Sequence, residues 1–343
     1  MARIPEAVAE SSFSRAVIAL GYPLLYQGKV GELYEVPSKP HQLLMLRSDR
    51  LSIFDFVLAC LVEQKGEVLI ALTHYWLTQV FPDVPNHLLA WGRDRERWEA
   101  AGWNETSVCQ LPLERILLIE RGEAWRFEMI FRAHIGGSVW QEYEQSGTAC
   151  GQSLPPGIKK WQKLPGRPIF TPTTKAESGH DIKVTVADYL TATHDLGRKL
   201  MDRDRQVYER AYVHAAGRGI LILDTKFENN NRGDLIDEIL TPDSSRFTTP
   251  EDLAAAIAEG RDPIFYDKEP VRIWGRQVPT PWGVGLHQLD PENSEHLAFI
   301  EGLAIPDDII AKTQRRYFDI FGRLTGMSLR KYQETVMVIW AMD

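Results

Sequence analysis

The chain has 343 residues, of which 44% are apolar, and its formal net charge is −8 at neutral pH. A chain of this length can bury a large core and favours two lobes over one. The acidic balance argues against a general nucleic-acid or membrane-surface protein, because either would need a basic excess. Any anionic substrate must therefore meet a local cluster of basic side chains.

The apolar runs and the cysteines of the chain indicate the cellular compartment in which we expect the protein. No apolar run approaches the length of a membrane span, and the first 14 residues lack the apolar segment of a signal peptide. The three cysteines, Cys60, Cys109 and Cys150, are widely spaced and match no metal-ligand pattern. We therefore expect thiols that fill space in a cytoplasmic protein.

A strand pair around a glycine-bearing turn is the first predicted element, over residues 25–36. Gly28 lets backbone N–H groups approach a phosphate, and the Lys29 ammonium adds a point charge. An ordinary hairpin is the alternative, because no helix with Lys-Ser/Thr follows as in a Walker A loop. Further strands are expected over 41–47, 56–62, 86–89, 115–120 and 127–131, with one main helix over 68–81. Residues 1–121 are thus predicted to form a strand-rich N-terminal lobe, and 122–343 a C-terminal lobe.

The segment from Arg132 to Tyr143 predicts an anion site. A strand ends in Gly136-Gly137, and Ser138 is expected to cap the helix that follows, with backbone N–H groups open to an anion. Arg132 could grip the same anion through its forked guanidinium. A capped helix with a surface arginine is the alternative. A proline-rich loop then covers 154–175, and a long helix is expected over 183–218.

A charged hairpin follows that helix. Strands are predicted over 219–223 and 235–240, with Asn229 to Asp234 as the turn. Alternation places Asp224, Lys226 and Glu228 on one face, which suits a divalent metal and the phosphates it carries. A solvated hairpin face is the alternative. Capped helices are expected next, one from Pro250 to a stop at Gly260, and one over 309–324 before Gly326.

Together these motifs resemble the phosphoribosylaminoimidazole-succinocarboxamide synthase (SAICAR synthetase) family. The matching segments follow the family's order between residues 25 and 247, and they are Gly28-Lys29-Val30, Ser48 to Asp55, Pro85 to Leu88, Gly137-Ser138, Pro168 to Glu177, Asp224 to Glu228 and Leu235 to Arg246. The resemblance implies a two-lobed α+β fold of the ATP-grasp or kinase-like type. Its N-terminal lobe would carry an antiparallel sheet, and its larger C-terminal lobe would be mixed α/β.

The resemblance also implies an activity. The family joins the carboxylate of 5-amino-1-(5-phosphoribosyl)imidazole-4-carboxylate to L-aspartate, with ATP and Mg²⁺, in de novo purine biosynthesis, through an acyl phosphate. The partners would be these small molecules, with no nucleic acid and no membrane. A carboxylate–amine ligase with another amine donor, or a small-molecule kinase, is the alternative, because the ATP and metal motifs would be unchanged.

Residue roles follow from the same resemblance. Lys226 and Asp224 would be catalytic, and Glu228 and Asp237 would bind Mg²⁺. ATP would be bound by Gly28, Lys29 and Lys175, and the 5′-phosphate of the ribonucleotide by Arg132, Ser138 and Arg246.

Three positions depart from the family pattern. Gly31 stands where an arginine is usual, which removes one positive charge near the nucleotide. His134 replaces a common tyrosine, and Asn229 to Asn231 replaces a Phe-Gly. None of these departures removes a residue assigned to the chemistry.

Overall fold

The computed structural model describes residues 3–174 and 182–339, and it divides into two compact units. Unit 1 comprises Met1–Tyr75, His87–Gly122 and Asp267–Asp343, and unit 2 comprises Trp76–Asn86 and Glu123–Tyr266. This division differs from the two consecutive lobes expected from the sequence. One boundary falls at Gly122/Glu123, but Trp76–Asn86 belongs to unit 2 and the last segment belongs to unit 1, because the helices of that segment pack on elements of unit 1.

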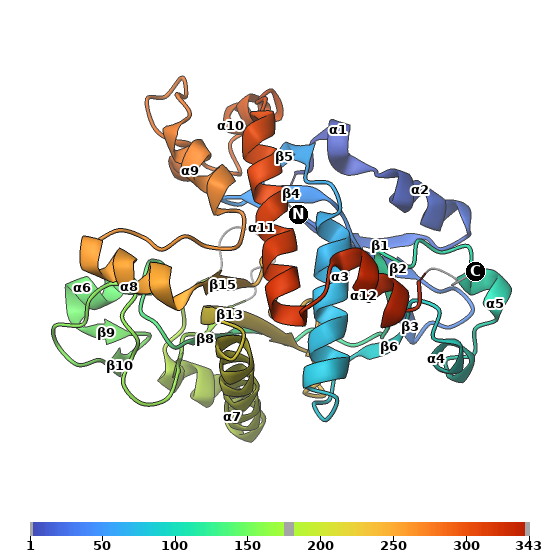
Figure 1. Cartoon of the computed structure of the whole chain (residues 1–343), viewed down its shortest axis with the longest axis horizontal. Coiled ribbons are helices and arrows are strands. Elements are labelled where there is room, and N and C mark those ends of the chain that lie inside the picture. The colour runs from blue at the N-terminus through green and yellow to red at the C-terminus, as the bar shows by residue number, and fades with distance from the viewer. Residues whose placement is uncertain (1–2, 175–181, 340–343) are drawn as a thin grey trace. The chain divides into compact units, whose positions relative to one another are not determined.

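A five-stranded antiparallel sheet is the centre of unit 1 (Figure 1). Its strands, in spatial order, are β1 (Leu24–Gln27), β2 (Gly31–Glu35), β3 (Gln42–Arg47), β7 (Ile116–Glu120) and β6 (Leu88–Trp91). The middle strands are apolar on both faces, and Leu44, Leu46 and Leu118 are fully buried. The sheet is therefore covered on both sides near its centre.

The β4–β5 hairpin of unit 1 (β4 Arg50–Ile53, β5 Phe56–Leu61) forms a separate two-stranded sheet. Its apolar side chains join a buried cluster with the segment from Val271 to Ile305. That segment contains α9 (Glu269–Gln277), the short 3-10 helix η2 (Leu286–Gln288) and α10 (Ser294–Glu301). Residues distant in sequence thus support this hairpin.

Helix α3 (Lys65–Tyr75) is a core helix, because every one of its residues is buried. It packs beside α11 (Asp307–Thr325) and α12 (Leu329–Thr335) (Figure 1). The predicted helix over 68–81 therefore begins earlier, and from Trp76 to Val80 it continues as a π-helix, η1. The remaining helices of unit 1 are short: α1 (Glu6–Ala9), α2 (Ser12–Ala19), α4 (Arg95–Ala100) and α5 (Glu105–Val108).

A six-stranded antiparallel sheet is the centre of unit 2. Its longest strand, β13 (Leu221–Asn229), pairs with β8 (Phe127–Arg132), β15 (Ser245–Thr248) and the short β14 (Leu235–Ile236). Strands β11 (Ile169–Phe170) and β12 (Thr173–Thr174) pair with β8. The predicted hairpin is present, but its first strand extends to Asn229 and its second is only two residues long.

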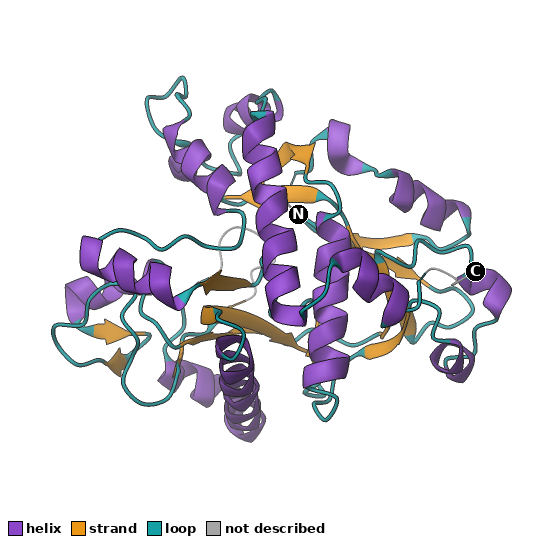
Figure 2. Cartoon of the chain, viewed as in Figure 1, coloured by secondary structure: helices purple, strands orange, loops and turns teal. Residues whose placement is uncertain are grey.

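Helix α7 (Val186–Ala216) packs against β8 and β13. A non-helical residue, His194, interrupts it. Figure 2 shows the helices in purple and the strands in orange. Helix α8 (Pro250–Glu259) has the predicted caps, with Thr249 before it and a left-handed Gly260 after it. The other elements of unit 2 are α6 (Ser138–Ser146), β9 (Thr148–Ala149) and β10 (Gln152–Ser153).

Two features of the expected class can be checked directly. All three cysteines lie in the described part of the chain and are free thiols. Cys150 is buried, but Cys109 is exposed and so does not fill space as expected. Among residues 3–174 and 182–339, no helix is long and apolar enough to cross a bilayer.

Candidate active site

The glycine–lysine turn of unit 1 lies between β1 and β2. The turn is closed by a hydrogen bond from the Gly28 N–H to the Gly31 carbonyl at 2.8 Å. A Cβ on Gly28 would lie 3.2 Å from the Tyr26 ring, so a side chain there would be tight. The Lys29 ammonium forms an ion pair with Asp55, and 40% of the Lys29 side chain is exposed. A solvent-accessible cation thus sits on a small turn, as the sequence predicts.

Arg50 holds this turn from the protein side. Its guanidinium donates to the Lys29 carbonyl at 3.1 Å and to the Gly28 carbonyl at 3.2 Å. The same group pairs with Glu32 at 2.6 Å, and both side chains are buried. Burial alone would raise the pKa of Glu32, but the hydrogen bonds and charges of Tyr34 and Arg50 lower it overall. The buried pair therefore stays ionised and fixes the turn.

Position 31, where the resemblance leads us to expect an arginine, is closely packed. A Cβ on Gly31 would lie 1.8 Å from the Arg47 Nη1 atom. The guanidinium of Arg47, on the neighbouring strand β3, therefore occupies the space that a side chain at position 31 would need. The turn has no arginine at position 31, but the guanidinium of Arg47 lies beside it.

Three charged residues form a row across the sheet of unit 2. Asp224 on β13 lies opposite Arg132 on β8 and opposite Arg246 on β15. One Asp224 oxygen, Oδ2, accepts from both guanidiniums at 2.5 Å. Burial lowers the pKa of Arg132, and the Asp224 carboxylate opposes that effect. The two arginines that the sequence predicts as a phosphate clamp are thus held by one carboxylate.

The start of α6 adjoins this row. A Cβ on Gly137 would lie 3.1 Å from both terminal nitrogens of Arg246, so the guanidinium packs on this glycine. Gly137 has φ of 63° and is the N-cap, while Ser138 is the first helical residue. The expectation that Ser138 caps the helix is therefore wrong, because the left-handed glycine turns the chain one residue earlier. Arg246 and the N–H groups of the first turn still lie together.

Lys226 and two glutamates form the second cluster of unit 2. The ammonium donates to Glu228 on its own strand and to Glu128 on β8, each at 2.8 Å. Burial alone would lower the pKa of Lys226, but Glu228, Glu128 and Asp237 raise it well above the ordinary value. Lys226 is therefore held as a cation at neutral pH. The contact between Lys226 and Glu228 agrees with the predicted alternation.

Glu128 is a member of this cluster that the sequence interpretation did not name. Besides Lys226, it accepts a hydrogen bond from the Thr173 hydroxyl at 2.7 Å. The sequence contains a signal for Glu128, because it lies four residues before Arg132 on one strand and the two side chains therefore share a face. Lys175, predicted to bind ATP, lies outside the described residues.

The predicted metal ligands are Glu228 and Asp237. Asp237 has φ of 64°, a left-handed conformation that few non-glycine residues adopt. Within residues 3–174 and 182–339, no group of three or more His, Cys, Asp or Glu side chains is arranged as a metal site. The carboxylates still suit Mg²⁺, which is commonly held by one or two carboxylates together with substrate phosphates and water.

His134 stands where the resemblance leads us to expect a tyrosine. Its Nδ1–H donates to the Trp161 carbonyl at 2.9 Å, and its Nε2 accepts from the Tyr212 hydroxyl at 3.1 Å. Burial lowers the pKa of His134 to about 4. The neutral ring therefore has a structural role at the end of β8.

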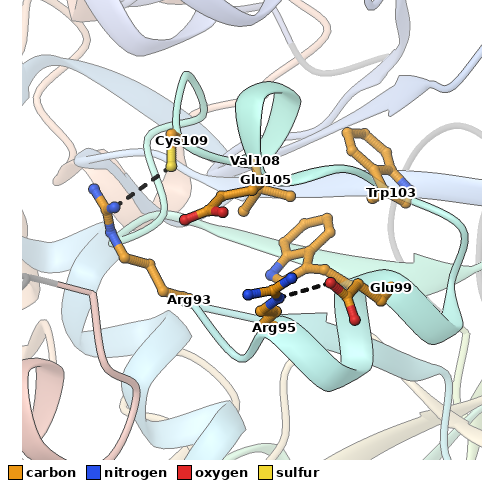
Figure 3. Close-up of a pocket in the computed structure, with 8 residues that line it drawn as sticks. Arg93, Arg95, Glu99, Trp103, Glu105, Val108 and Cys109 are labelled. Carbon is orange, nitrogen blue, oxygen red and sulfur yellow. Dashed lines mark hydrogen bonds and ion pairs between the residues drawn. The ribbon is translucent and has the colours of Figure 1, made fainter.

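A surface pocket elsewhere in unit 1 is unrelated to these clusters. Figure 3 shows it, with Arg93 donating to the Cys109 sulfur at 3.4 Å and Arg95 to Glu99 at 2.7 Å. Its other lining residues are Trp98, Trp103, Glu105 and Val108. None of the eight is a predicted site residue.

Comparison with known proteins shows the family of the chain. The sequence profile of SAICAR synthetase matches residues 24–289, which is more than half of the chain. The chain belongs to the SAICAR synthetase family. A phosphoribosylaminoimidazole-succinocarboxamide synthase of Saccharopolyspora erythraea is 36% identical over 314 residues, covering 90% of this chain and 95% of that protein. The corresponding protein of Methylibium petroleiphilum is 37% identical over 316 residues, covering 89% and 95%.

A solved structure gives the same result for the fold. The SAICAR synthase of Saccharomyces cerevisiae, in complex with SAICAR, is 30% identical with a TM-score of 0.70. The match covers 90% of this chain and 96% of that one. The expected α+β fold is confirmed, and family membership establishes an ATP-dependent ligase of purine biosynthesis.

Proposed function

We propose that unit 2 binds the carboxyaminoimidazole ribonucleotide along β8, β13 and β15, and that the glycine–lysine turn of unit 1 binds ATP. One observation carries the proposal. The Arg132–Asp224–Arg246 row and the Glu128–Lys226–Glu228 cluster occupy the same two central strands, β8 and β13. Two arginines that can bind a phosphate and a lysine that can bind a carboxylate thus lie along one sheet. A substrate with a phosphate at one end and a carboxylate at the other requires such a pair of sites.

The phosphate end is assigned to Arg132, Arg246 and Ser138. Guanidiniums bind phosphate through paired N–H groups, and a helix N-terminus adds backbone donors. Asp224 touches both guanidiniums, so its contacts support a role in positioning them. Asp224 was predicted to be catalytic, and we propose that it acts indirectly, by positioning the two arginines.

The carboxylate end is assigned to Lys226. In the proposed reaction the γ-phosphoryl group of ATP is transferred to a carboxylate oxygen, giving an acyl phosphate and ADP. The aspartate amine then attacks the carbonyl carbon, the C–N bond forms, and phosphate leaves. Negative charge grows on the transferring group, and a fixed ammonium stabilises it without any reorganisation. The raised pKa of Lys226 keeps that charge in place.

Magnesium is proposed to bind at Glu228 and Asp237, with Glu128 beside them. Carboxylate oxygens are the donors Mg²⁺ prefers, and phosphate oxygens would complete its coordination. When bound, the ion would neutralise charge on the phosphates of ATP. Glu128 and Glu228 carry two negative charges against one from Lys226, which leaves the cluster able to accept a cation.

The ATP site is assigned to Gly28 and Lys29, with Lys175 as a further predicted contact. Strand β1 exposes Leu24, Leu25 and Tyr26, each more than 40% accessible. An exposed apolar strand directly before a phosphate turn offers a surface on which a purine ring can lie. We place the reaction in the cytoplasm, where the small-molecule substrates are made.

The test is a coupled assay of ADP release with each substrate omitted in turn. We expect ADP only when the ribonucleotide, L-aspartate and Mg²⁺ are all present. ADP release that is indifferent to aspartate would contradict the proposal, because the acceptor amine would then play no part. A panel of other amine donors separates aspartate specificity from a general carboxylate–amine ligase.

A further inference from the structure

The β4–β5 hairpin touches the glycine–lysine turn at two places. Arg50, at the start of β4, holds the Gly28 and Lys29 carbonyls. Asp55, in the turn of the hairpin, forms the ion pair with the Lys29 ammonium. The first contact fixes the backbone of the turn, while the second occupies the group that would bind a phosphate. The following inference rests on the proposed role of Lys29.

The Lys29–Asp55 pair is open to solvent. The side chains are 40% and 42% exposed. An anionic ligand can therefore reach the ammonium, and it must replace the carboxylate as the ammonium's partner. A carboxylate and a phosphate oxygen offer the same lysine the same kind of charge-assisted hydrogen bond.

The hairpin turn that carries Asp55 has an unfavourable backbone. Ile53 pairs with Phe56, so Phe54 and Asp55 form a two-residue turn with φ of 50° and 68°. Two consecutive left-handed residues normally call for Asn-Gly. A phenylalanine in that conformation persists only where surrounding contacts hold it.

Those contacts come from α9 and η2. The Phe54 ring lies 5.8 Å from the His287 ring, and the Arg276 guanidinium lies 5.7 Å from the Phe54 centroid. A Cβ on Gly275 would lie 3.0 Å from Ile53 Cδ1 and 3.3 Å from Phe54 Cε2. Gly275 thus allows α9 to approach the hairpin closely. We call the contacts of Phe54 with His287, Arg276 and Gly275 the Phe54 clamp.

We propose that Asp55 is an internal counter-ion that competes with nucleotide phosphates for Lys29, and that the Phe54 clamp maintains this competition. The ligand class is a nucleoside di- or triphosphate. A half-exposed ion pair is weak, so the competition lowers nucleotide affinity by a few-fold and does not abolish it. The benefit is easier release of ADP after each turnover.

The test measures ADP binding in the presence of Mg²⁺ by calorimetry. Asp55→Asn keeps the side-chain shape, and asparagine tolerates a left-handed conformation well. We expect it to bind ADP about fivefold more tightly than the wild type. Equal or weaker binding would overturn the proposal, because Asp55 would then be neutral or would contact the ligand favourably.

A matched control separates this effect from net charge. Glu35→Gln removes one negative charge from β2, where Glu35 pairs with Arg121 at 3.0 Å and is 41% exposed. We expect its ADP affinity to be unchanged, and a gain equal to that of Asp55→Asn would overturn the proposal. Lys29→Ala tests the underlying role: if it weakens binding while Asp55→Asn has no effect, only the counter-ion inference fails. If Lys29→Ala binds ADP as tightly as the wild type, both the role of Lys29 in ATP binding and the counter-ion inference are wrong.

The clamp has its own test. His287→Ala removes a ring contact of Phe54 and should tighten ADP binding in the wild-type background. In the Asp55→Asn background it should have no effect, because the competing charge is already gone. The same gain in both backgrounds would overturn the role of the clamp. Thermal unfolding of each variant confirms that the compared proteins are folded.

Discussion

The Lys226 ammonium on β13 donates to Glu128 on β8 at 2.8 Å, the same distance that separates it from Glu228. One lysine thus joins two carboxylates from adjacent strands. Without it, two like charges would face each other across the sheet, which is destabilising. The same contacts keep the lysine protonated, so the stability of the strand pair and the charge of the site depend on one group.

Removing Glu128 should change the pH dependence of the reaction. Glu128→Gln withdraws one of the charges that raise the pKa of Lys226, so that pKa should fall. The alkaline limb of the kcat profile should then move to lower pH, because Lys226 would lose its proton at a lower pH than in the wild type, while kcat at neutral pH should change much less. A pH–rate series from neutral to alkaline pH measures this shift. An unchanged alkaline limb would show that Lys226 does not limit the rate.

Replacing Lys226 itself should have the largest effect on catalysis. Lys226→Ala should lower kcat by about 100-fold to 1000-fold, the typical effect of losing one preorganised charge. Lys226→Arg keeps the charge and should retain part of the activity. Lys199→Ala, an exposed lysine of α7, is the control and should be neutral. Steady-state kinetics with circular dichroism separates loss of chemistry from loss of fold.

The proposed phosphate clamp predicts an effect on substrate binding. Arg246→Lys loses the forked geometry but keeps the charge, so KM for the ribonucleotide should rise about tenfold while kcat changes little. Arg210→Lys is a matched control, because Arg210 makes a two-pronged pair with Asp83 at 2.8 Å in the same unit. A change in KM for ATP alone would contradict the assignment of Arg246.

Metal dependence offers a test of Asp237. Asp237→Asn keeps the shape and tolerates the left-handed backbone, so the fold should survive. The Mg²⁺ concentration for half-maximal activity should rise about tenfold, because a charged oxygen ligand is lost. Asp83→Asn makes the same substitution at an exposed position of unit 2 and should leave the Mg²⁺ requirement unchanged.

His134 should make the stability of the folded protein sensitive to acid. Its folded pKa is about 4 and its ordinary value is 6.5, so the unfolded chain binds more protons between these values. Stability is therefore full above pH 6.5 and falls as the pH drops toward about 4, by up to ~3 kcal/mol. His134→Gln cannot titrate and should reduce this slope. Denaturant unfolding at pH 7, 6, 5 and 4 measures the difference.

Much of the local structure could be predicted because it depends on neighbouring residues. The Gly28–Lys29 turn, the capped helix after Thr249 and the left-handed stop at Gly326 follow from backbone preferences. The same holds for the shared face of Lys226 and Glu228, which alternation sets. Local predictions were wrong at Ser138, where a glycine one residue earlier supplies the turn, and in the strand expected over 235–240, which ends at Ile236.

The partners of these residues could not be predicted in the same way. Which strand lies beside β13, and in what register, depends on packing between segments almost 100 residues apart. A shift of one residue would separate Arg132 from Asp224 and would turn Glu128 away from Lys226. The assignment of Asp267–Asp343 to unit 1 has the same origin, because it depends on apolar contacts with the β4–β5 hairpin.

The sequence by itself therefore determined the family, the fold class and the charged residues proposed for the site other than Glu128, because motifs and short-range preferences are written in adjacent positions. Only the tertiary structure decided which charges meet: Asp224 with two arginines, Glu128 with Lys226, and Asp55 with Lys29. The physical reason is that strand register and hairpin support are set by the burial of apolar surface contributed by distant parts of the chain.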